Sequence, residues 1–188
     1  YVNRGVGVAR GVTRSSSLHS SSGEYEFDYR KMDKLPWEDG AYYNTWRFRD
    51  STVNWVASGD RGKPKLLLIH GFGASVYHFR NQLAVLGRDY RVFAFDMVGL
   101  GLSDKPLVDY TAELWRDQAL AFVEEVVMKE DDKPCVVCGN SLGGFTALYA
   151  ASSERADKMI NGCILLNAAG RFKSSYVEAK SDPTWLSS

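Results

Sequence analysis

Short apolar runs of strand length alternate with longer segments of helical spacing between residues 65 and 166. This alternation restricts the fold more than any other feature, because strands joined by helices pair in parallel and the helices cover both faces of the sheet. Upstream, residues 45–55 alternate apolar and polar side chains around a turn at Asp50-Ser51, which is typical of a hairpin. We therefore predict an α/β fold: a mostly parallel sheet with helices on both faces, preceded by an antiparallel hairpin. The predicted strands are 65–69, 91–95, 135–138 and 162–166, and the predicted helices are 75–86, 111–129 (capped by Thr111) and 142–152.

Charge and hydropathy exclude several classes of function. The 23 basic and 23 acidic residues cancel at neutral pH, so net charge provides no attraction to nucleic acid. No apolar run approaches the roughly 20 residues that a membrane-spanning helix needs. We expect a soluble protein that binds no nucleic acid, although it could still touch a membrane surface.

Three cysteines, an odd number, argue against a disulfide framework. Cys135 and Cys138 form a C-x-x-C pair, but the residues around them read as a buried strand. Side chains three apart on a strand point to opposite faces and lie about 10 Å apart, too far for a disulfide. We expect these cysteines to be structural. The cysteines and the three histidines never cluster at ligand spacing, so no metal site is predicted.

The first 23 residues differ in composition from the rest. They contain three arginines and two serine runs, with no acidic residue before Glu24. This composition fits an organelle transit peptide, or an ordinary disordered terminus, because the apolar segment of a secretory signal is missing. We predict a disordered or transit-peptide-like segment at 1–40, the N-terminal part of a larger α/β core at 41–170, and the start of a lid over that core at 171–188.

The strongest local signal is Gly139-Asn-Ser141-Leu-Gly143, which fits the G-x-S-x-G pattern. In this pattern a serine occupies a sharp turn between a strand and a helix, so that its hydroxyl projects above the sheet. Side chains at the two glycine positions would collide across the turn. Residues Phe145, Leu148 and Ala151 supply an apolar face for the following helix. Ser141 is therefore the predicted nucleophile.

His70-Gly71-Phe72-Gly73 follows the leucine-rich strand directly. Acyl transfer at a serine needs two N–H donors for the oxyanion, one from the residue after the nucleophile and one from a loop of this kind. We predict the backbone N–H groups of Leu142 and Phe72 in these roles. We expect His70 to hold the loop by hydrogen bonding, rather than to act as the base. Asp96 ends the next strand, and we expect it to accept N–H bonds from the glycine turn after it.

Three stretches carry a family resemblance: residues 70–80, 139–148 and 165–172. They resemble the plastid chlorophyll dephytylases of the α/β-hydrolase superfamily and, less closely, the pheophytinases. The resemblance implies a chloroplast enzyme that hydrolyses the phytyl ester of chlorophyll or a derivative. It also implies a small-molecule ester substrate, contact with the thylakoid surface and no need for a metal or other cofactor. In such folds the lid sets the substrate, so a general lipid or small-ester esterase is an alternative.

The remaining members of a catalytic triad are not found. In this fold the order is serine, acid, histidine, yet His19, His70 and His78 all precede Ser141. Asn167, rather than a carboxylate, follows the last predicted strand. We therefore expect a chain truncated before its lid and last strands, with little or no esterase activity by itself.

Two other classes of function remain open from the sequence. A receptor or binding protein on the same fold would have the same N-terminal half. A dinucleotide-binding domain would explain Gly71-x-Gly73 after a strand and an acid at Asp96, but position 76 is Val where the third glycine belongs. That second alternative also leaves the Ser141 motif unexplained.

Overall fold

The computed structural model describes residues 43–170. The predicted N-terminal segment 1–40 and the predicted start of the lid at 171–188 lie outside the described residues. No helix within 43–170 has the length and apolarity required to span a bilayer.

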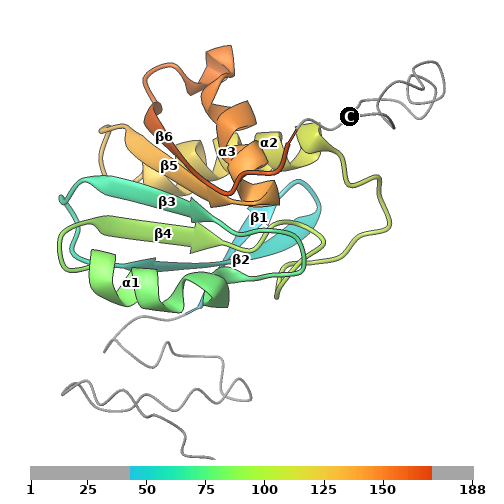
Figure 1. The fold of residues 1–188 in the computed structure, drawn as a ribbon, viewed down its shortest axis with the longest axis horizontal. Coiled ribbons are helices and arrows are strands. Elements are labelled where there is room, and N and C mark those ends of the chain that lie inside the picture. The colour runs from blue at the N-terminus through green and yellow to red at the C-terminus, as the bar shows by residue number, and fades with distance from the viewer. Residues whose placement is uncertain (1–42, 171–188) are drawn as a thin grey trace, which may run out of the picture.

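Six strands form one twisted sheet in the order β1-β2-β4-β3-β5-β6 (Figure 1). Strands β3, β4, β5 and β6 are parallel, whereas β2 pairs antiparallel with both β1 and β4. The predicted hairpin and the predicted parallel sheet are thus confirmed. The strands are β1 Asn44–Phe48, β2 Ser51–Ser58, β3 Lys65–Ile69, β4 Arg91–Phe95, β5 Cys135–Asn140 and β6 Ile160–Leu166.

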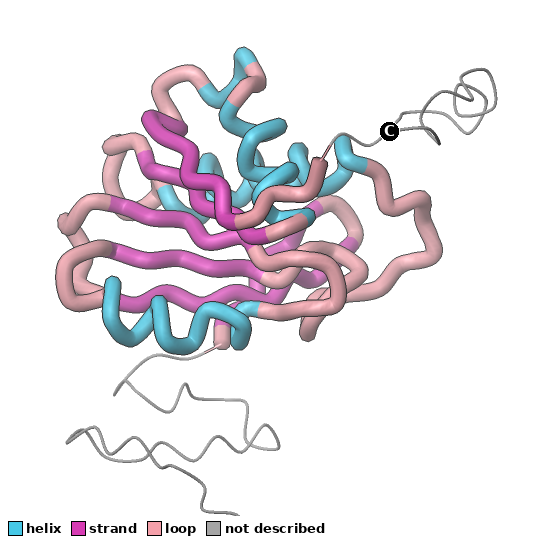
Figure 2. The backbone as a smooth tube through the Cα atoms, viewed as in Figure 1, coloured by secondary structure: helices cyan, strands magenta, loops and turns pink. Residues whose placement is uncertain are grey.

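Helices cover both faces of the sheet, as predicted (Figures 1 and 2). Because side chains alternate along a strand, successive residues of β3 and β4 enter two separate cores. Leu67 and Phe93 belong to the core under α2 and α3, whereas Leu66 and Val92 belong to the core under α1. The helices are α1 Arg80–Leu86, α2 Ala112–Phe122 and α3 Leu142–Ala151, and a 3₁₀ turn, Val76–Phe79, leads into α1.

Three helix predictions differ from the structure. The helix expected over 75–86 ends as predicted, but its first turn is the 3₁₀ turn and α1 begins only at Arg80. The helix expected over 111–129 begins as predicted, because the Thr111 side chain accepts a hydrogen bond from the Leu114 N–H. However, α2 ends at Phe122, and the chain continues as a π-helical turn, Val123–Val127.

The apolar face predicted for α3 is wrong. Leu148 is 49% exposed, whereas the small residues Ala147 and Ala150 are fully buried. Close approach of α3 to the sheet selects small side chains, which a hydropathy pattern does not reveal.

Candidate active site

Ser141 lies at the turn between β5 and α3, where it caps the helix with φ 53° and ψ −118°. A positive φ is rare for a residue with a side chain and costs energy unless neighbouring contacts hold it. Here the Ser141 N–H donates to the Leu166 carbonyl at 3.1 Å, and the Ser141 carbonyl accepts from the Ala169 N–H at 2.8 Å. Hydrogen bonds from the end of β6 and from Ala169 just after it therefore hold the strained turn in place.

The glycines around Ser141 are required by close backbone contacts. A β-carbon on Gly139 would lie 2.0 Å from the Gly143 carbonyl oxygen, across the turn. A β-carbon on Gly143 would instead lie 2.1 Å from the carbonyl oxygen of Ile69, so the crowding at this position comes from β3 and not from across the turn as expected. Gly144, which the motif does not include, is also crowded, because its β-carbon would lie 2.7 Å from that of Ala168.

The loop after β3 lies against the turn that holds Ser141. A β-carbon on Gly71 would lie 3.1 Å from the β-carbon of Ser141, and Gly73 adopts a φ of 69° that favours glycine. Phe72, Ser141 and Leu142 line one pocket. As the first residue of α3, Leu142 has no partner for its N–H within the helix. The structure brings the two predicted oxyanion donors to the predicted nucleophile, and their role stays a prediction.

The pocket at Ser141 has a volume of about 730 Å³ and aromatic walls. Tyr110 and Trp115 stack with ring centroids 6.2 Å apart, and Phe145 and Tyr149 pair at 6.0 Å. The Phe72 side chain, 79% exposed, forms part of the rim. The sequence motifs did not identify these aromatic residues, because no fixed spacing marks them. The lining residues are Phe72, Tyr110, Thr111, Ala112, Glu113, Trp115, Ser141, Leu142, Phe145, Tyr149 and Ala169.

Glu113 is the carboxylate that lines this pocket. Its oxygen accepts a hydrogen bond from the Tyr149 hydroxyl at 3.2 Å, and that hydroxyl accepts one from Arg116 at 2.9 Å. Hydrogen bonding from its own backbone N–H, and then from Tyr149, lowers the pKa of Glu113 below its ordinary value. A carboxylate with a lowered pKa is a weak base, so Glu113 is a poor candidate for activating Ser141.

His70 is the first residue of the loop after β3, residues 70–73, and it is fully buried. We call these residues the oxyanion loop, after their predicted role. Its Nδ1 lies 2.8 Å from the Gly71 carbonyl oxygen and its Nε2 lies 3.1 Å from the Met97 backbone nitrogen. The tautomer that satisfies both contacts has a proton on Nδ1 and accepts at Nε2. Burial lowers the pKa of His70. With both ring nitrogens occupied, His70 connects the loops after β3 and β4 and is not placed to serve Ser141 as a base.

Asp96 is also fully buried and holds the same two loops. One carboxylate oxygen accepts from the Val76 N–H at 2.6 Å. The other accepts from the Leu102 N–H at 2.8 Å and from the Asn54 side chain at 2.9 Å. Because these contacts occupy both of its oxygens, the Asp96 carboxylate has a structural role.

Within residues 43–170 neither histidine lines the Ser141 pocket, and His19 lies outside the described residues.

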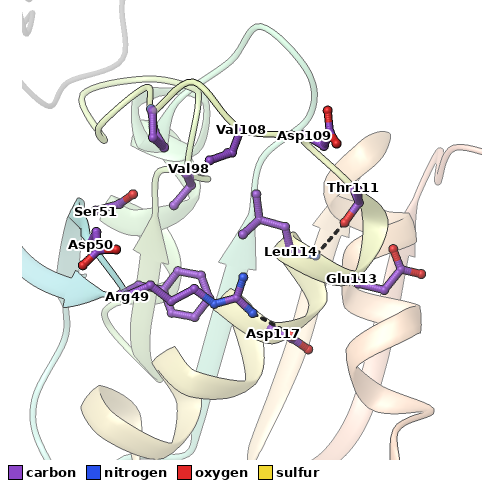
Figure 3. Close-up of a pocket in the computed structure, with 12 residues that line it drawn as sticks. Arg49, Asp50, Ser51, Val98, Val108, Asp109, Thr111, Glu113, Leu114 and Asp117 are labelled. Atoms are coloured by element: carbon purple, nitrogen blue, oxygen red, sulfur yellow. Dashed lines mark hydrogen bonds and ion pairs between the residues drawn. The ribbon is translucent and has the colours of Figure 1, made fainter.

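A second pocket, of about 330 Å³, lies beside the N-terminus of α2 (Figure 3). Arg49 extends toward Asp117, and their side chains form an ion pair of 3.0 Å. Val98, Val108 and Leu114 provide its apolar wall. Thr111 and Glu113 line both this pocket and the Ser141 pocket, so the two adjoin at the beginning of α2, although Ser141 itself does not line the smaller one.

All three cysteines are free. Burial raises the pKa of Cys135 to about 12 and also raises those of Cys138 and Cys163. Within residues 43–170 no group of three or more histidine, cysteine or acidic residues is placed to hold a metal ion.

Comparison with known proteins places these features in context. The family model described as alpha/beta hydrolase fold matches residues 64–187. A chloroplastic pheophytinase of Arabidopsis thaliana is 38% identical over a match covering 56% of this chain and 27% of that protein. Epoxide hydrolase 4 of Mus musculus is 37% identical, covering 56% of this chain and 29% of that protein. The chain thus spans less than a third of the length of these two relatives.

Solved structures share the same architecture. A membrane phospholipase A, described as a bacterial virulence factor, superposes with a TM-score of 0.62 at 26% identity, covering 77% of this chain and 47% of that one. The thioesterase domain from the curacin biosynthetic pathway superposes with a TM-score of 0.63 at 23% identity, covering 76% and 52%.

Proposed function

This chain belongs to the alpha/beta hydrolase fold family, and we propose that it carries the nucleophile and oxyanion site of a serine-dependent carboxylic-ester hydrolase. The observation that carries the proposal is the backbone of Ser141, which keeps a φ of 53° at the turn between β5 and α3, on the wall of an aromatic pocket. Strain of this kind persists where it presents a reacting group.

The proposed reaction uses the residues around this turn. The Ser141 hydroxyl oxygen attacks the ester carbonyl carbon while a general base takes the hydroxyl proton. The N–H groups of Leu142 and Phe72 stabilise the oxyanion, the alcohol leaves with a proton, and water then hydrolyses the acyl-serine. Glu113, His70 and His78 do not suit the role of base, and no histidine follows Ser141 in this sequence. The proposal therefore assigns the base and the triad acid to no residue of this chain.

For the substrate we propose the phytyl ester of chlorophyll or of a chlorophyll derivative, with the chloroplast as the location and the thylakoid surface as a contact. The 38% identity to a chloroplastic pheophytinase supports this choice. The aromatic walls of the Ser141 pocket also suit a bulky apolar group. The identity to an epoxide hydrolase does not lead us to propose an epoxide substrate, because Ser141 stands where epoxide hydrolases place a carboxylate nucleophile.

A fluorophosphonate probe tests the nucleophile, because it reacts well only with an activated serine. Because the base and the triad acid are assigned to no residue of this chain, the probe is applied to a longer form of the protein that includes a triad acid and histidine. In that form we expect labelling of Ser141, loss of labelling in Ser141→Ala, and unchanged labelling in Ser152→Ala at the far end of α3. Labelling of any other serine, with none at Ser141, would contradict the proposal.

The substrate is tested separately. In the same longer form of the protein, release of phytol from pheophytin or chlorophyll, measured by chromatography, is compared with hydrolysis of p-nitrophenyl butyrate. Hydrolysis of the short ester alone, with Ser141 labelled, would reject the chlorophyll substrate and retain the serine esterase.

A further inference from the structure

A third cavity, of about 540 Å³, adjoins the oxyanion loop on a different side from Ser141. The two cavities have no lining residue in common, since Phe72 lines the Ser141 pocket and Gly73 lines this one. The loops after β3 and β4 and the beginning of α1 form its walls. Its lining residues are Gly73, Ala74, Ser75, Tyr77, His78, Arg80, Gly99, Leu100, Gly101 and Lys105, and we call it the basic cavity.

The charge of the basic cavity is one-sided. Arg80, Lys105 and His78 line it, and no acidic residue does. Elsewhere in the described chain, basic side chains commonly pair with a carboxylate, as Arg91 does with Glu130 at 2.7 Å. Within residues 43–170 neither Arg80 nor Lys105 forms an ion pair. Their positive charges are therefore left for a ligand to neutralise.

Both cationic side chains are already held in place. The Lys105 ammonium donates to the carbonyl oxygens of Gly101 at 2.7 Å and Ser103 at 3.0 Å. The Arg80 guanidinium lies 4.6 Å from the centroid of the Tyr77 ring and donates to the Tyr77 carbonyl at 3.3 Å. Neutral partners fix these side chains without cancelling their charge. A ligand would thus meet two ordered cations, which lowers the entropic cost of binding.

Glycine backbone lines the basic cavity and is open to a ligand at Gly73. At Gly99 the Tyr110 ring, and at Gly101 the Asp96 carboxylate, fill the space that a β-carbon would need. Gly73, Gly99 and Gly101 have φ values of 69°, 93° and 54°, so side chains are disfavoured at all three positions. Nothing lies within 4 Å of a β-carbon placed on Gly73. The Asp96 carboxylate lies beneath Gly101, but it is fully buried and already accepts three hydrogen bonds. Its three donors are neutral and leave its negative charge in place, so Asp96 offsets part of the positive charge of Arg80 and Lys105, although it exposes no carboxylate oxygen to an anion.

We propose that the basic cavity binds the phosphate group of an anionic ligand, with Arg80 and Lys105 as the recognising residues. A guanidinium and an ammonium beside exposed glycine backbone are the groups that recognise phosphate in proteins. The phosphate belongs either to a soluble phosphate ester or to the headgroup of an anionic phospholipid. The proposal does not rest on the chemistry assigned to Ser141.

The test uses inorganic pyrophosphate and the full 188-residue chain at low ionic strength. Isothermal titration is expected to show binding that weakens as sodium chloride is added. Arg80→Gln and Lys105→Gln should each weaken the affinity about tenfold, because each removes one charge-assisted hydrogen bond. Arg88→Gln, an exposed position in the loop after α1 with the same loss of charge, should leave it unchanged. Circular dichroism verifies that all three variants are folded.

Vesicle sedimentation distinguishes the two sources of phosphate. Binding to phosphatidylglycerol vesicles that pyrophosphate displaces, and that Arg80→Gln weakens, would identify a lipid headgroup. Pyrophosphate binding without vesicle binding would identify a soluble ligand. Absence of pyrophosphate binding, or equal binding by all three variants and the unaltered chain, would overturn the proposal.

Discussion

The first turn of α3 crosses the end of β3 so closely that no side chain fits between Gly143 and Ile69. A β-carbon on Gly143 would lie 2.1 Å from the Ile69 carbonyl oxygen, well inside any van der Waals contact. This crossing fixes the position of Ser141 relative to the loop that begins at His70. The distance between nucleophile and oxyanion loop thus depends on the absence of a single methyl group.

Gly143→Ala should destabilise the chain by about 1–3 kcal/mol, because the added methyl group meets backbone that cannot move aside cheaply. In the longer form of the protein that includes the triad acid and histidine, it should also abolish fluorophosphonate labelling of Ser141, since α3 must shift. Urea unfolding followed by circular dichroism measures the first effect. Gly162→Ala is the control, because its nearest contact is the Val136 Cγ2 at 3.3 Å. That variant should stay within about 0.5 kcal/mol of the unaltered chain. Equal stability of both variants would contradict the close crossing.

The elements that sequence predicted best are those in which hydropathy alone decides the structure. Strands β3 and β4 have the predicted bounds, because each is a continuous apolar run covered on both faces. The buried face of α3 was not predictable, because a close helix contact favours alanine and glycine over the larger Phe145 and Leu148. The crowding at Gly144 arises from Ala168, 24 residues along the chain, so only the folded structure reveals it.

The candidate site was predictable only where a motif has fixed spacing. Ser141, Leu142 and Phe72 line one pocket. They were found because each belongs to a short, unbroken motif, 70–73 or 139–143. The aromatic walls come from α2, from α3 and from the loops that hold Phe72 and Tyr110, which the fold brings together without any sequence signature. The basic cavity was missed for a similar reason, because Arg80 begins α1 whereas Lys105 lies in the loop after β4.

Asp96→Asn should destabilise the chain by about 1–3 kcal/mol, because the amide replaces one accepting oxygen with a donor that faces other donors. The buried carboxylate accepts from Val76, Leu102 and Asn54, so at least one of these bonds is lost. Denaturant unfolding measures the effect. Asp104→Asn is the matched control, because this exposed carboxylate accepts from the Thr52 N–H alone. A smaller loss in Asp96→Asn than in the control would show that Asp96 does not hold the loops.

The three cysteines should react slowly with Ellman's reagent at pH 8 in the folded chain. The thiolate is the reactive form, and burial raises the pKa of Cys135 to about 12 and also raises those of Cys138 and Cys163. Unfolding in guanidinium chloride should release all three thiols to fast reaction. Fast reaction of the folded chain at Cys135 or Cys138 would instead favour a redox role for the C-x-x-C pair.

His70 should make the chain less stable as the pH falls below about 6.5. Burial lowers the pKa of His70 from its ordinary value of 6.5, so the unfolded state takes up a proton that the folded state resists. The stabilisation is therefore fully present above pH 6.5 and is lost as the pH falls toward the folded pKa. A proton on Nε2 would also face the Met97 N–H, because that nitrogen now accepts from it at 3.1 Å.

Urea unfolding at pH 7.5 and 5.5 measures this dependence. His70→Gln removes the titrating ring and should lose less stability between the two pH values than the unaltered chain does. His78→Gln, at an exposed position in the turn before α1, removes a charge that contributes to lowering the pKa of His70, so it should reduce the dependence less than His70→Gln does. Because every other titrating group is common to the unaltered chain and His70→Gln, the difference in slope between these two proteins isolates His70. An identical slope in His70→Gln would mean that the buried ring accepts a proton without disturbing the loops after β3 and β4.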